Sequence, residues 1–195
     1  MSANRKLLVA ALAGAGTIFI WGGLSHMVLL KGVGFSRLPD EDRVISQVRR
    51  SIPDEGLYFF PALDLRKTAT PEEQANWEAK FRAGPRGMIV VQPSGDTPVS
   101  SRKLLVQMLS ALFASLIATW VVAQQAGASF RRRLLVTGSL GAFSWLTVST
   151  IYWNWYGFPN AFAIAQCVDM VVGWCLAGAV VAGILGREHA RPRAT

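Results

Sequence analysis

Hydrophobic positions along the chain fall into four long runs, and a polar stretch separates the first run from the second. Each run holds about 20 residues or more, enough for a helix to cross ~30 Å of hydrocarbon. The runs read LLVAALAGAGTIFIWGGLSHMVLL, LLVQMLSALFASLIATWVVA, LLVTGSLGAFSWLTVSTIYW and AFAIAQCVDMVVGWCLAGAVVAGIL. The pattern predicts a membrane all-α fold, a four-transmembrane-helix bundle with helices over residues 7–30, 104–126, 134–154 and 160–186.

The first run has a second interpretation, a cleavable signal peptide, because Arg5 and Lys6 precede it. It is longer than the apolar region of such a peptide, and SHMVLLKG is a poor cleavage site. We interpret it as an uncleaved anchor.

The polar stretch, residues 31–103, is expected to form a small α+β extracytoplasmic module. LPDEDRVISQVRRSI places Val44, Ile45, Val48 and Ile52 on one helical face. GLYFFPA and GMIVVQP are short, aromatic or β-branched and bounded by Gly or Pro, so we expect two strands that pair as a ribbon. About 70 residues bury little core alone. We therefore expect the apolar faces of the module to rest on the membrane helices or the bilayer surface.

A second helix of the module is marked at both ends. In TPEEQANWEAKFRAGP, Thr70 is suited to the N-cap position and Glu73 completes a capping box, while Gly84 follows the last helical residue. Trp77 and Phe81, four residues apart, give this helix one apolar face.

Composition and charge agree with a membrane protein. The chain is 51% hydrophobic and 16% charged, and of its 12 acidic residues only Asp169 and Glu188 lie outside residues 31–103. Basic residues of the short segments lie on one side of a four-span topology: Arg5, Lys6, Arg131, Arg132, Arg133, Arg187, Arg191 and Arg193. The positive-inside rule then predicts cytoplasmic N- and C-termini, with a cytoplasmic tail over 187–195. The net charge of +8 suits anionic lipid rather than nucleic acid.

An aromatic cluster joins the last two runs. Trp153, Trp155, Tyr156 and Phe158 are expected to form an interfacial rim, where amphipathic rings prefer the headgroup layer. The alternative is that the cluster walls a binding site for a lipid, a quinone-like ring or a partner helix. Asn154 favours this alternative, because an interfacial belt does not require an amide.

Two ionisable residues fall inside the predicted helices. Asp169 lies on a stripe of small residues in the fourth helix, and His26 lies about one turn from the outer end of the first. An intramembrane carboxylate usually finds a partner or water. We expect Asp169 to form either a structural polar latch with His26, Asn154, Tyr152 or a backbone group, or a site that titrates or binds a ligand.

The sequence offers few candidates for catalysis. Cys167 and Cys175 are eight residues apart on one predicted helix, so they cannot bond to each other. HExxH, GxSxG, a phosphate-binding loop and an acidic metal cluster are all missing from the sequence. We expect no cofactor and no metal site, and an enzyme is the least favoured class.

The segments GLYFFPALD, AGPRGMIVVQPSGD and IYWNWYGFP together resemble a family of small four-helix bacterial inner-membrane proteins whose activity is uncharacterised. The resemblance covers most of the chain and implies a bacterial inner membrane. It implies no activity and no catalytic residues.

Two functions remain open at this point. The first is an accessory, assembly or lipid- or partner-binding protein of the inner membrane. The second is a small oligomeric transporter or proton-coupled protein that uses Asp169. The expected partners are the lipid bilayer and a membrane protein or further copies of the chain.

Overall fold

The computed structural model describes residues 2–64, 66–125 and 127–186. The predicted tail, 187–195, therefore lies outside the described residues. The chain divides into two compact units, residues 1–35 with 98–195, and residues 36–97. Each unit is described by itself.

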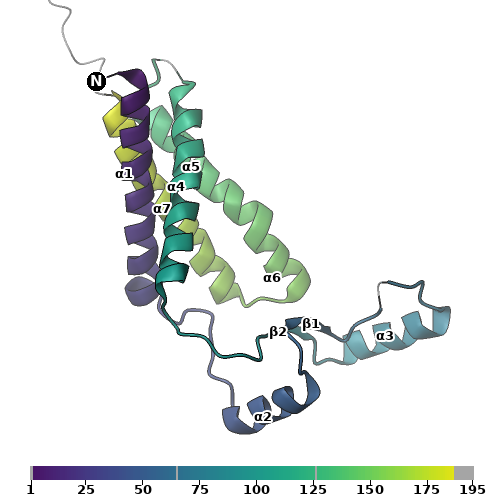
Figure 1. Cartoon of the computed structure of the whole chain (residues 1–195). Helices are drawn as coiled ribbons and strands as arrows, with labels where there is room; N and C mark the ends of the chain where they lie inside the picture. The colour runs from purple at the N-terminus through teal and green to yellow at the C-terminus, as the bar shows by residue number, and fades with distance from the viewer. Residues whose placement is uncertain (1, 65, 126, 187–195) are drawn as a thin grey trace, which may run out of the picture. The chain divides into compact units, whose positions relative to one another are not determined.

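The first unit is a helical bundle in which each of four helical segments is long and apolar enough to cross a membrane (Figure 1). The segments are α1, Ala3–Leu24, with a π-helical continuation, Ser25–Leu29; α4, Ser101–Ala123; α5, Phe130–Ser144, with the π-helical Trp145–Ser149 and α6, Thr150–Tyr156; and α7, Asn160–Gly186. The four runs of the sequence thus correspond to four long helical segments, as predicted.

Three of these segments begin or end a few residues from the expected boundaries. The third starts at Phe130 rather than residue 134, because the Ser129 hydroxyl accepts a hydrogen bond from the Arg132 N–H and caps the helix. The second starts at Ser101 because Ser100 caps it in the same way. The first starts at Ala3. Arg131 to Arg133 consequently belong to a helix and not to a connection.

Small side chains fill the centre of the bundle. Among the described residues, every buried hydrophobic residue of the bundle is alanine or valine, and the core cluster is Ala10, Val122 and Val181, with Ile184 and Leu185 against it. The Ser115 hydroxyl of α4 donates to the Ala11 carbonyl of α1 at 2.8 Å, a buried bond between helices. Small residues therefore form contacts between these helices.

Large apolar side chains lie on the outside of the same bundle. Ile20 is 70% exposed, Phe113 62%, Ile117 63% and Trp120 63%. This distribution reverses that of a water-soluble bundle, in which large apolar residues form the core.

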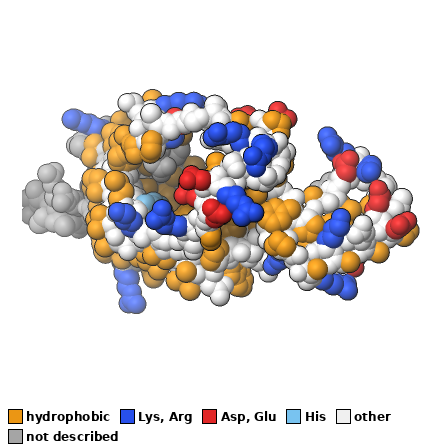
Figure 2. All heavy atoms as spheres, turned by 90° about the horizontal axis from the view of Figure 1, so that it is seen from below, with side chains coloured by type: hydrophobic (Ala, Val, Ile, Leu, Met, Phe, Trp, Pro, Cys, Tyr) orange, Lys and Arg blue, Asp and Glu red, His pale blue; other side chains and the backbone are white. Residues whose placement is uncertain are grey.

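The second unit is the predicted α+β module. It contains α2, Glu41–Ser51; β1, Gly56–Phe60; α3, Pro71–Ala83; and β2, Gly87–Val91. The two strands pair antiparallel with Tyr58 opposite Ile89, so the predicted ribbon is confirmed. The capping box of α3 is also confirmed: Thr70 Oγ1 accepts from the Glu73 N–H, and a Glu73 carboxylate oxygen accepts from the Thr70 N–H at 2.8 Å. Both signs of charge are spread over the surface around α3 (Figure 2).

Candidate functional site

The site is centred on the place where α1 passes into its π-helical continuation. A π-helical turn shifts the side chains that follow it relative to a regular helix, and such turns recur at functional sites. Ser25, the first residue of the turn, is fully buried, and His26 follows it with a side chain that is 59% exposed.

Asp169 lies opposite this turn on α7. Ser25 Oγ donates a short hydrogen bond to one carboxylate oxygen, and His26 Nε2 lies 3.5 Å from the other. The Asp169 side chain is 16% exposed. One carboxylate oxygen is thus held by a buried hydroxyl, while the other faces a largely exposed imidazole.

The backbone of Asp169 is held as well. The Trp21 indole N–H donates to the Asp169 carbonyl oxygen at 3.0 Å. Gly173, one turn further along α7, permits this close approach, because a Cβ there would lie 2.7 Å from Trp21 Cδ1. Any larger residue at 173 would push the indole away from α7.

A cavity of about 520 Å³ opens beside these groups, within the size range of small-molecule sites. Three helices line it. Its residues are Ile18, Phe19, Trp21, Gly22, Gly23, His26, Met27, Leu104, Gln107, Asp169, Met170, Gly173 and Trp174. Asp169, His26 and Gln107 are its polar side chains apart from the indoles, and the remaining wall is apolar.

The structure brings together two of the four predicted latch residues. His26 and Asp169 are adjacent, whereas in the part of the chain that the structure describes no hydrogen bond joins Asp169 to Asn154 or Tyr152. Asn154 is exposed on α6, and the Tyr152 ring contacts Phe158 at a tilt of 39°, with centroids 5.3 Å apart.

Ser25 and Trp21 are the partners of Asp169 that sequence reasoning missed. Their spacing of four places them on one helical face, and this was the available signal. The sequence pattern gave no sign that a π-helical turn follows Leu24.

The aromatic rim forms a separate structure around the turn between α6 and α7. Gly157 ends α6 in the left-handed region, with φ of +74°, and Trp153 Nε1 donates to Asn160 Oδ1 at 2.7 Å. Phe158 also contacts Phe162, with centroids 5.3 Å apart. Trp155 and Tyr156 are exposed on α6. None of the rim residues lines the cavity beside Asp169.

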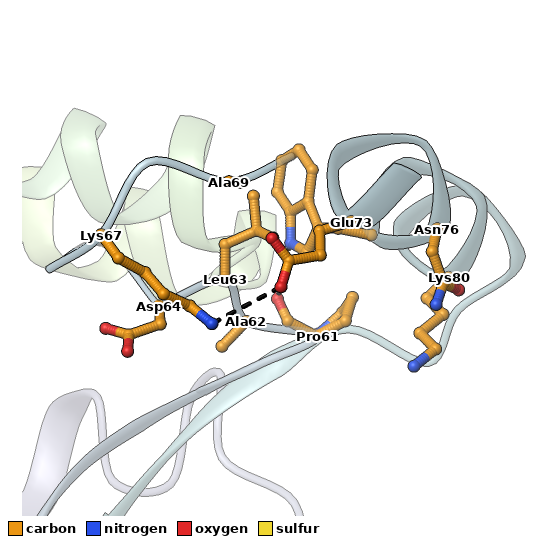
Figure 3. A pocket seen from close by; sticks show the side chains of 10 residues that line it. Pro61, Ala62, Leu63, Asp64, Lys67, Ala69, Glu73, Asn76 and Lys80 are labelled. Atoms are coloured by element: carbon orange, nitrogen blue, oxygen red, sulfur yellow. Dashed lines mark hydrogen bonds and ion pairs between the residues drawn. The ribbon is translucent and has the colours of Figure 1, made fainter. Parts of the chain in front are cut away.

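The second unit contains a smaller cavity of about 370 Å³ between α3 and the segment after β1 (Figure 3). Lys67 Nζ lies 3.5 Å from a Glu73 carboxylate oxygen, and Trp77 Nε1 donates to the Pro61 carbonyl at 3.1 Å. The Thr70 N–H bond, followed by the Lys67 charge, holds the pKa of Glu73 below its ordinary value. Lys67 and Glu73 are paired with each other and are well exposed, so this cavity is the weaker candidate.

The described residues contain no group of three or more His, Cys, Asp or Glu side chains that could hold a metal ion. Cys167 and Cys175, both on α7, are free thiols. The chain matches no protein-family model, no curated protein and no solved structure.

Proposed function

We propose that this chain is a multi-pass membrane protein that binds a lipid-soluble ligand in the cavity beside Asp169. The membrane part rests on the four long apolar segments and on the reversed distribution of small and large apolar residues. The observation that carries the ligand part is a cavity of about 520 Å³ whose apolar wall contains one nearly buried carboxylate. A purely structural latch requires no such cavity.

The proposed location is a bacterial inner membrane, with cytoplasmic termini. Basic residues support this orientation, because more of them lie at the end of the bundle that holds the N-terminus (Arg5, Lys6 and Arg131 to Arg133) than at the other end (Lys31, Arg102 and Lys103). Lys6 Nζ donates to the Leu185 carbonyl near the C-terminal end of α7 at 3.2 Å, and Arg133 is buried near Gly186. The second unit is then extracytoplasmic, and the protein acts as a binding or accessory component rather than as a catalyst.

Two glycines of α1 provide a direct test of ligand binding. A Cβ at Gly22, which lines the cavity, or at Gly16, which does not, meets no atom within 4 Å. Gly22→Phe should therefore fill the cavity, while Gly16→Phe is the matched control. Native mass spectrometry of protein released from membranes in mild detergent should show a bound small molecule in wild type and Gly16→Phe. If Gly22→Phe retained the small molecule as well as wild type does, the proposal would be contradicted.

A second candidate function is a proton-coupled transporter, and it is favoured by the fact that Asp169 lines the cavity. Such a protein needs a titratable group in contact with the transported molecule. Flux into proteoliposomes under an imposed pH gradient tests it. Flux that survives Asp169→Asn unchanged would exclude Asp169 as the coupling group.

A further inference from the structure

The charge of the cavity wall identifies the kind of ligand it suits. Among the residues that line the cavity, Asp169 is the one carboxylate, and none is a lysine or an arginine. An anionic head group would therefore meet a carboxylate with no fixed positive charge to offset it. In a low-dielectric site this repulsion is costly, whereas a cationic head group is attracted.

The Asp169 carboxylate still has room for a cation. Ser25 Oγ occupies one oxygen, while the other faces His26 Nε2 at 3.5 Å, beyond the usual length of a strong charge-assisted hydrogen bond. The imidazole is 59% exposed, so solvent and not packed protein covers more than half of its side chain.

Three aromatic rings also line the cavity. Phe19, Trp21 and Trp174 all line it together with Asp169. The faces of aromatic rings, tryptophan above all, attract ammonium-type cations, and this is how proteins recognise quaternary ammonium groups. Ile18, Met27, Leu104 and Met170 supply apolar wall for a hydrophobic tail or ring.

We propose that the ligand is a lipophilic cation, an amine or quaternary onium group carrying hydrophobic substituents, whose charge pairs with Asp169 and the neighbouring rings. This inference rests on the proposed function, because it assigns the chemistry of a ligand in the same cavity. It distinguishes this cavity from a site for fatty acids or for the phosphate group of an anionic lipid.

Tetraphenylphosphonium and tetraphenylborate provide the test, because they share a shape and carry opposite charge. Equilibrium dialysis against protein in uncharged maltoside micelles, referred to protein-free micelles, measures both affinities. Wild type should bind tetraphenylphosphonium at least tenfold more tightly than tetraphenylborate. Asp169→Asn should remove most of that preference, while Asp64→Asn, in the second unit, should leave it unchanged. Trp174→Leu is a second variant that tests the site should Asp169→Asn not fold. It should weaken binding of tetraphenylphosphonium severalfold, because Trp174 lines the cavity.

The outcomes separate the two proposals. Equal or stronger binding of tetraphenylborate by wild type would overturn the assignment of a cation. If that binding were lost in Gly22→Phe, the cavity would still be a ligand-binding site. Absence of binding of both ions, together with no bound small molecule in native mass spectrometry, would overturn the ligand-binding function itself.

Discussion

The Trp21 indole N–H and the Asp169 backbone carbonyl are joined by a 3.0 Å hydrogen bond that links α1 to α7. The same indole lies against Gly173 and lines the cavity. Trp21 thus sets the distance between two helices at the depth where the Asp169 carboxylate meets Ser25. The apolar bulk and the polar N–H of one side chain both act at the site.

Trp21→Phe tests the polar part of this contact. It keeps an aromatic ring and removes the hydrogen-bond donor. We therefore expect the free energy of unfolding to fall by about 0.6 kcal/mol, the average for intramembrane polar contacts, and by at most about 2 kcal/mol. Trp120→Phe is the control, because Trp120 is 63% exposed on α4. Thermal unfolding in detergent should separate the two variants. An equal melting temperature for both would mean that the Trp21 bond does not tie α1 to α7.

The sequence was sufficient to predict the helical segments, the ribbon and the caps of α3, because each depends on a local pattern. Hydrophobic length indicates the long helices, and Thr70 with Glu73 marks a helix start independently of the rest of the fold. The topology allowed Asp169 to meet His26, because both were expected in the outer half of the bilayer, but Asn154, Tyr152 and a backbone group remained open as partners. Those features required no knowledge of side-chain packing.

Ser25 and Trp21 could not be assigned in this way. Their contacts with Asp169 depend on the rotation of α1 about its axis, which a hydrophobic run alone does not specify. The π-helical turn at Ser25–Leu29 then shifts the residues that follow it, His26 among them. Asn154 shows the converse. Its place between two tryptophans suggested a binding role, but Asn154 is exposed on α6 and, among the described residues, forms no hydrogen bond with Asp169.

The second unit should depend on Trp77. Its indole N–H donates to the Pro61 carbonyl at 3.1 Å, and its ring contacts Phe81 with centroids 5.3 Å apart. Trp77→Ala should loosen the segment after β1 and speed proteolysis within residues 61–70 severalfold. Thr70→Ala should speed proteolysis less, because the loss of this N-cap costs about 1 kcal/mol of helix stability. Thr68→Ala, at an exposed position, should leave the rate of proteolysis unchanged. Unchanged cleavage of Trp77→Ala would show that the unit is not packed around this residue.

The capping box of α3 should weaken in acid. Glu73 has a lowered pKa, chiefly because its carboxylate accepts the Thr70 N–H bond. Its contribution to stability is therefore present above the ordinary value of 4.5 and is lost as the pH falls through the lower folded pKa. Protection of the amides at the start of α3, taken relative to their intrinsic exchange rates at each pH, should fall below about pH 4.5 more than in Glu73→Gln. An equal response to acid in wild type and Glu73→Gln would mean that other groups control the opening of the first turn of α3.

Reporter fusions test the proposed orientation. A fusion after Gly127, in the connection before α5, should read cytoplasmic, and one between Thr68 and Ala75 should read extracytoplasmic. The reason is the positive charge at Arg131 to Arg133, which resists translocation. Replacing these three arginines with glutamine should weaken or invert the signals. An extracytoplasmic signal at Gly127 in the native sequence would contradict the four-span orientation.

The Ser25–Asp169 pair should show energetic coupling, because the buried hydroxyl has the carboxylate as its closest acceptor. Ser25→Ala removes that donor, and Asp169→Asn keeps the shape while removing the charge. Each should lower the melting temperature, and the double variant should lose less than the sum, since either change alone breaks the same bond. Asp169→Leu should be worse than Asp169→Asn, because it adds a branched apolar group where Trp21 and Ser25 already lie close. The same variants separate the two roles of Asp169. A structural latch predicts strong energetic coupling between Ser25→Ala and Asp169→Asn, whereas ligand binding predicts that Asp169→Asn loses affinity for tetraphenylphosphonium. Additive effects with unchanged affinity would deny both roles.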